Sequence, residues 1–162
     1  MKPILSIIAL VICLSSHGQK VVGQYQDYFG HTLILKPDSS FEFTWHLDLE
    51  GSWNKGKWSL YKDTLTLSTV LLYDTLRTSL LIGQTHDSLV VSNDQKAEVI
   101  TTLYPGYITT VWQNRIPPPL KLYYYRNRLY RVLNSGSLDK TKKQEFWTQK
   151  MYHTWFKKTA SL

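Results

Sequence analysis

Three carboxylates recur in nearly the same local sequence, and such a repeat could supply acid and base groups. Asp63, Asp74 and Asp87 are each followed by Thr or Ser and then by Leu. Two carboxylates held at one site can act as general acid and general base. Alternatively, these residues belong to turns, because an Asp side chain bonds readily to nearby backbone N–H groups.

The spacing of the three copies favours turns over catalysis. They are separated by 11 and 13 residues, which suits an up-and-down run of short strands. In this interpretation each Asp ends a turn, the Thr or Ser begins a strand, and the Leu points inward. The aspartic-protease signature also begins with Asp-Thr/Ser, but it requires Gly next, where this chain has Leu in every copy.

Other patterns that carry chemistry do not occur in the sequence. No two of His31, His46, His86 and His153 have the close spacing of metal ligands. The single cysteine is Cys13, and there is neither a Gly-x-Ser-x-Gly elbow nor a Gly-rich phosphate loop. We therefore expect no enzyme activity, no cofactor and no metal site.

Three tryptophans are the best candidates for binding a small molecule. Trp45, Trp58 and Trp112 each lie in an alternating run, on the face that we expect to point inward. In a closed barrel such residues either fill the core or line a cavity. The first functional hypothesis is a protein that holds a small apolar or amphipathic ligand in the barrel.

The last part of the chain is strongly basic and suggests a second hypothesis. Residues 115–162 carry eleven Lys or Arg and two Asp or Glu, whereas residues 19–114 carry seven and ten. Such a surface attracts anionic envelope material, although it can also be a solvated face that keeps the protein soluble. A non-catalytic structural or surface-interaction module would then use its exterior. The residues predicted to make this contact are Arg126, Arg128, Arg131, Lys142 and Lys143.

The first 18 residues have the layout of a secretory signal. Lys2 precedes an apolar run over residues 4–14, and small residues at Ser16 and Gly18 suit a signal peptidase. The run is too short to span a membrane, which takes about 20 apolar residues. We expect cleavage after Gly18 and export to the periplasm or the outside of a Gram-negative bacterium. Such a protein has no transmembrane span and seldom meets nucleic acid.

The elements that must position these residues are mainly strands. Phe41, Phe43 and Trp45 alternate with polar residues, as do Trp58 and Leu60, and this period of two is typical of strands with one buried face. The sequence predicts one antiparallel β domain over residues 19–136, an up-and-down meander or barrel.

The segment 137–162 has a different pattern and keeps two interpretations open. Trp147, Met151 and Trp155 are four residues apart, which favours an amphipathic helix packed on the sheet or lying on a surface. The same aromatic residues could also form a last strand. In either case this basic aromatic segment packs on the β domain or extends it.

The first half of the chain resembles a group of small secreted proteins of Bacteroidetes-type bacteria. The resemblance is carried by Gly23 and Tyr25, Leu33 to Phe41, Gly56 to Trp58, and Asp63 to Leu67. It covers about a third of the chain and implies a lipocalin-like β-barrel. Most members of the group have no established activity, so the resemblance implies no catalytic residue.

Overall fold

The computed structural model describes most of the chain as β-strands. The described residues are 20–79, 84–101, 111–114, 118–145 and 147–161. Eight strands of the nine-stranded main sheet make up its barrel: β1 (Gly23–Gln26), β2 (His31–Leu35), β3 (Ser40–Leu47), β4 (Glu50–Tyr61), β5 (Thr64–Val70), β10 (Lys121–Tyr125), β11 (Arg128–Arg131) and β14 (Phe156–Ala160). The predicted signal sequence lies outside the described residues.

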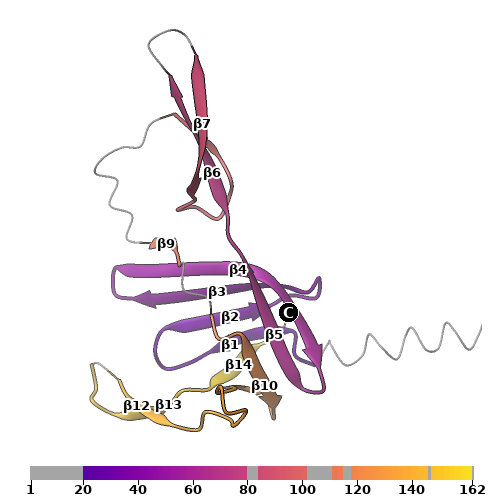
Figure 1. Ribbon diagram of the computed structural model, residues 1–162. Helices are drawn as coiled ribbons and strands as arrows, with labels where there is room; N and C mark the ends of the chain where they lie inside the picture. Colours follow the sequence, from indigo (N-terminus) through magenta and orange to yellow (C-terminus); the bar gives the residue numbers. More distant parts are fainter. Residues whose placement is uncertain (1–19, 80–83, 102–110, 115–117, 146, 162) are drawn as a thin grey trace, which may run out of the picture.

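These eight strands close into an antiparallel barrel (Figure 1). Each barrel strand, β3 and β4 included, pairs with the next barrel strand in chain order, and the last strand, β14, pairs with β1. The order is interrupted twice, by strands inserted between β5 and β10 and between β11 and β14. The predicted fold class, a mainly β up-and-down barrel, is therefore confirmed.

Most of the inserted strands form two smaller sheets, and one of them extends the main sheet. Between β5 and β10 lie β6 (Tyr73–Ser79), β7 (Thr85–Val91), β8 (Val99–Ile100) and β9 (Val111–Gln113). The hairpin of β6 and β7 stands away from the barrel, while β9 pairs with the start of β4 (Figure 1). Between β11 and β14, β12 (Lys142–Gln144) pairs with β13 (Met151–His153).

The first Asp-Thr-Leu copy lies at a turn between two strands, as predicted. Lys62 and Asp63 both have positive φ and join β4 to β5, as the type I′ turns of tight hairpins require. Thr64 then begins β5, and Leu65 is fully buried. Asp63 therefore turns the chain.

The other two copies do not end turns, and that part of the prediction was wrong. Asp74 lies inside β6 and is almost buried, with its Oδ1 accepting a hydrogen bond from the Glu98 backbone N–H at 3.0 Å. Asp87 lies inside β7 and forms an ion pair with Arg77 across the hairpin. The leucine after Asp87 is exposed, because this hairpin packs no face against the barrel core.

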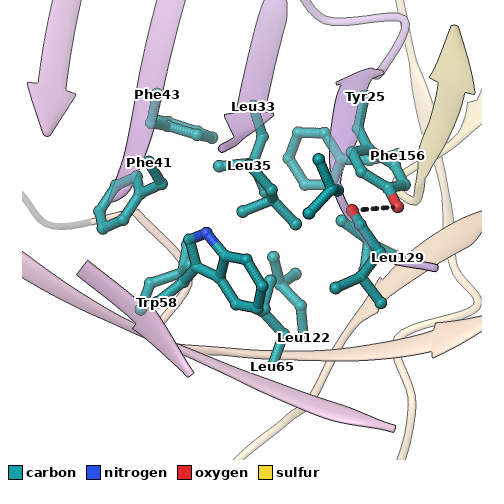
Figure 2. Close-up of a cluster of buried hydrophobic side chains, with 13 residues drawn as sticks. Tyr25, Leu33, Leu35, Phe41, Phe43, Trp58, Leu65, Leu122, Leu129 and Phe156 are labelled. Carbon is teal, nitrogen blue, oxygen red and sulfur yellow. Dashed lines mark hydrogen bonds between the residues drawn. The ribbon is translucent and has the colours of Figure 1, made fainter. Parts of the chain in front are cut away.

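One hydrophobic cluster occupies the barrel interior (Figure 2). Every barrel strand contributes to it. The Tyr25 hydroxyl, which is buried with the ring, donates to the Val21 carbonyl at 2.8 Å, so the ring needs no polar partner from another strand. Burial raises the pKa of this hydroxyl far above its usual value. The members are Val21, Val22, Tyr25, Leu33, Leu35, Phe41, Phe43, Trp58, Leu65, Leu67, Leu122, Leu129 and Phe156.

The Gly-x-Trp pair of residues 56–58 has a packing explanation. A Cβ at Gly56 would clash with the backbone carbonyl of Ser68 and lie 2.9 Å from the Phe41 ring. Two residues later, the Trp58 indole is buried and donates to the Lys36 carbonyl at 3.1 Å. Glycine thus lets β4 approach its neighbours closely, and tryptophan ties it to the turn between β2 and β3.

We expect Gly56→Ala to lower the free energy of unfolding by about 1–3 kcal/mol through overpacking. Because the closest atom belongs to the backbone of β5, the side chains alone cannot relieve the clash. Urea unfolding followed by tryptophan fluorescence measures the change. The control is Ser59→Ala, an exposed position on the same strand where the change should stay within about 0.5 kcal/mol. Equal losses for both variants would contradict this account.

The prediction of a helix in the carboxyl-terminal segment was wrong. Its described residues form β12, β13 and β14, and no helix occurs in the described ranges. Thr154 and Phe156 are buried, whereas Trp147 and Met151 of the predicted helical face are exposed. The segment follows the two-residue alternation of a strand and not the four-residue spacing of a helix. The reason is that β14 pairs with both β1 and β11 and so closes the barrel.

Some predictions fall on residues that the structure does not describe. Most of the alternating run that contains Trp112 lies within 102–110. No helix in the described residues has the length and apolar character needed to cross a membrane.

Candidate functional site

The three candidate tryptophans do not come together at one site. Trp58 is buried in the core, and Trp45 is half-buried on β3, where its indole donates to the Phe29 carbonyl at 3.1 Å. Trp112 lies on β9, and 40% of its surface is exposed. Its predicted inward orientation was wrong, because β9 extends the sheet along β4 and contributes nothing to the cluster inside the barrel.

The repeated carboxylates also have separate partners. Asp63 lies in a turn, Asp74 accepts from a backbone N–H group, and Asp87 binds Arg77. The Arg77 guanidinium holds the pKa of the exposed Asp87 below its usual value, so Asp87 is ionised at neutral pH and holds no proton to donate. In the described part of the chain, no group of three or more His, Cys, Asp or Glu side chains could hold a metal ion.

A groove on the outside of the barrel brings together residues of four elements. It has a volume of about 250 Å³ and lies between the β12–β13 hairpin and the barrel strands β1, β11 and β14. Figure 1 shows this hairpin lying beside the barrel near β14. The lining side chains are Gln26, Tyr28, Arg128, Lys142, Met151, Tyr152, His153, Trp155 and Lys157. We call this site the basic aromatic groove.

Ring contacts hold the hairpin against the barrel and shape the groove. Tyr28, in the turn after β1, stacks on Tyr152 of β13 with ring centroids 4.3 Å apart. His153 stacks on Trp155 at 3.7 Å, and Tyr130 packs edge-on against the same indole at 5.2 Å. The aromatic wall is thus built from both the hairpin and the barrel, so it forms only when the two are packed together.

The cations of the groove are aligned by strand register. Arg128 on β11 is directly opposite Lys157 on β14, and Lys157 is in turn opposite Gln26 on β1. The Arg128 guanidinium also lies 4.9 Å from the centre of the Trp155 ring. Like charges directly opposite each other destabilise a sheet, so this row has a cost that a bound anion would remove.

No carboxylate offsets these charges within the described residues. The side chains lining the groove include three cations and no Asp or Glu. None of Arg128, Lys142 and Lys157 forms an ion pair with another described residue. The groove therefore presents uncompensated positive charge next to aromatic rings, which suits a ligand that carries an anionic group.

The five predicted cations occupy four kinds of position. Arg128 and Lys142 line the groove, whereas Lys143 is exposed on the same hairpin without lining it. Arg126 forms the β10–β11 turn and lies over the Tyr125 ring at 5.1 Å. Arg131 points the other way, toward the fully buried carboxylate of Asp27 at 3.8 Å.

Sequence reasoning missed most of the groove, although one signal was present. His153, Trp155 and Lys157 have the two-residue spacing of a strand face, and all three line the groove. Thr154 and Phe156 between them are buried. The helical interpretation hid this alternation. Tyr28 and Gln26 carried no such signal, because only the folding of the hairpin onto β1 brings them to the site.

Comparisons with known proteins found no matching family model, no matching curated protein and no matching solved structure.

Proposed function

We propose that this protein is an exported, non-catalytic binding module of the bacterial envelope that acts through its exterior. The basic aromatic groove would contact an anionic partner there. The observation that carries the proposal is the direct pairing of Arg128 with Lys157 beside Trp155, with no carboxylate among the groove side chains. The signal-like residues 1–18 and the resemblance to secreted Bacteroidetes-type proteins support export and a Gram-negative source.

The packed interior directs the proposal to the exterior. Thirteen buried side chains meet inside the barrel: Val21, Val22 and residues of all eight barrel strands, among them Trp58. A ligand inside would have to displace these contacts, whereas a ligand in the groove would displace only water. The groove is also the place where the sequence-predicted cations Arg128 and Lys142 lie near one another.

Co-sedimentation with anionic envelope material tests the proposal. We expect the protein to sediment with acidic cell-wall polysaccharide at about 0.01 M salt and to be released at about 1 M, where the Debye length falls from ~30 to ~3 Å. Lys157→Gln should reduce the bound fraction several-fold. Lys121→Gln is the matched control, because this lysine is also exposed on a barrel strand but does not line the groove. Equal binding by both variants would contradict the proposal.

The barrel architecture supports a second candidate, a small apolar or amphipathic ligand held in the barrel. Small closed barrels of this kind either fill their interior or hold one ligand. Titration with a fatty acid, read from the indole N–H NMR signal of the buried Trp58, tests this candidate. A saturable response would favour the barrel interior over the exterior, and no response would count against it.

A further inference from the structure

The groove contains the chemistry for a more specific ligand than an anionic surface. Resting on the proposed function, we propose that the basic aromatic groove binds one acidic sugar unit of a polysaccharide, such as a hexuronic acid residue. Its carboxylate would lie between Arg128 and Lys157, and its ring would lie against the aromatic wall.

The size of the groove suits a single sugar ring. Its volume of about 250 Å³ lies just below the ~300–1,000 Å³ typical of pockets for drug-sized ligands. A site of this size holds one ring or one charged group. Because the groove is on the outside of the barrel, a longer polymer can leave its neighbouring units in solvent while one unit is bound.

The polarity of the lining suits a ligand with an anionic group and hydroxyl groups. Arg128 and Lys157, paired across β11 and β14, can hold a carboxylate from two sides. Gln26 lies next to Lys157 in the adjacent strand and has both a donor and an acceptor for sugar hydroxyls. Lys142, on the opposite wall, adds further donors.

The aromatic rings supply flat apolar surface for the sugar ring. Tyr28 has 61% of its surface exposed, even though one side of its ring stacks on Tyr152. Trp155 is half-buried, stacks on His153 and lies 4.9 Å from the Arg128 guanidinium. Rings that are already fixed by stacking lose little conformational entropy when a ligand packs on them, which favours binding.

The concave shape argues for a sugar rather than a membrane as partner of this site. A protein that inserts into a lipid interface needs apolar side chains that project outward. Here the aromatic side chains form the walls of a recess together with cations, and of the lining side chains only Met151 is aliphatic. A bilayer cannot enter such a recess, whereas a sugar unit can.

Calorimetric titration of the full-length mature protein with an oligomer of galacturonic acid tests the inference. A neutral maltooligosaccharide of equal length and vesicles containing phosphatidylglycerol are the comparison ligands. We expect saturable binding of the acidic oligomer with one site per chain, at least about tenfold weaker binding of the neutral one, and no groove-dependent binding of the vesicles. Replacing a charged hydrogen-bond partner costs about tenfold to a hundredfold in affinity, so Arg128→Gln should weaken binding by that factor.

Two further variants separate stacking from stability. Tyr28→Phe keeps the ring and should bind as well as the wild type within about twofold, whereas Tyr28→Leu should lose about tenfold. Circular dichroism checks that both remain folded. Lys121→Gln, outside the groove, should leave binding unchanged.

The outcomes distinguish this inference from the proposed function on which it rests. If the vesicles bind and the acidic oligomer does not, with the binding lost in Arg128→Gln, the sugar assignment is wrong while the exterior anionic site stands. If equal affinity is found for the neutral oligomer, the role of the cations is wrong. If no anionic ligand binds, or if binding is unaffected by Arg128→Gln, both proposals fall.

Discussion

Replacement of Asp27 by alanine is expected to lower the free energy of unfolding by about 3–5 kcal/mol, the usual cost of breaking a buried ion pair from one side. The Asp27 side chain has no exposed surface. Its Oδ1 accepts hydrogen bonds from the backbone N–H groups of Phe29 and His31, at 2.8 and 3.0 Å. Its Oδ2 lies 2.9 Å from the His31 ring and 3.8 Å from Arg131.

The loss should be large because one side chain serves three elements. Asp27 shapes the turn between β1 and β2, fixes the His31 ring against Phe43, and balances the charge of Arg131 on β11. Without Asp27, the half-buried guanidinium of Arg131 loses its ion-pair partner, and Asp139 is the carboxylate that still interacts with its charge. Removing both partners therefore costs less than removing one, and Asp27→Ala with Arg131→Met should recover part of the stability.

A matched control exists at the next turn. Asp38 occupies a similar position between β2 and β3, and its Oδ1 accepts from the Ser40 backbone N–H group at 2.9 Å. Its hydrogen bonds to Ser40 lower the pKa of this exposed carboxyl, but no buried cation depends on it. Chemical denaturation at neutral pH should therefore give a much smaller loss for Asp38→Ala. Comparable losses at the two turns would contradict the role of the buried ion pair.

Replacement of Phe156 by alanine is expected to destabilise the protein by about 3–5 kcal/mol, as for other fully buried aromatic residues. The Phe156 ring packs edge-on against Phe43 at 6.1 Å and lies 5.7 Å from the Arg131 guanidinium. It is the residue of β14 that enters the core where this strand joins β1 to β11 (Figure 2). Its removal leaves a cavity at the point of barrel closure.

The same measurement on Trp147 tests the strand assignment of the carboxyl-terminal segment. In the helical interpretation Trp147 belongs to the buried face, whereas in the structure 66% of its surface is exposed. Trp147→Ala should therefore change the free energy of unfolding by about 0.5 kcal/mol or less. A large loss for Trp147→Ala and a small loss for Phe156→Ala would show that this segment packs as a helix.

The fold was predictable where alternation and turn chemistry agree. Phe41 and Phe43 alternate with polar residues and point into the core, and the turn at Lys62–Asp63 lies between two such runs. Arg126 and Asn127 likewise have positive φ in the tight turn between β10 and β11. In these places the local preference and the barrel require the same conformation.

The carboxyl-terminal segment was not predictable in the same way, because two periods coexist in it. Trp147, Met151 and Trp155 fit a helix, while His153, Trp155 and Lys157 fit a strand. The strand forms because it pairs with both β1 and β11, and a helix could pair with neither. Pairing between residues far apart in the chain is not visible in local sequence.

The functional site was only partly predictable for a related reason. Positive charge identified Arg128 and Lys142, but it identified Arg131 equally, and that residue faces a buried carboxylate. Whether a cation is free for a partner depends on which strand lies beside it. The aromatic half of the groove depends on the docking of a hairpin, which composition does not reveal.

Two-dimensional NMR of the protein, with the indole N–H signals of Trp58 and Trp155 resolved, tests the central claim most directly. The claim is that the protein binds through the groove on its exterior and not through its interior. On addition of a galacturonic acid oligomer, we expect the Trp155 signal to shift saturably while the Trp58 signal stays in place. A saturable shift of Trp58 with no change at Trp155 would contradict the account.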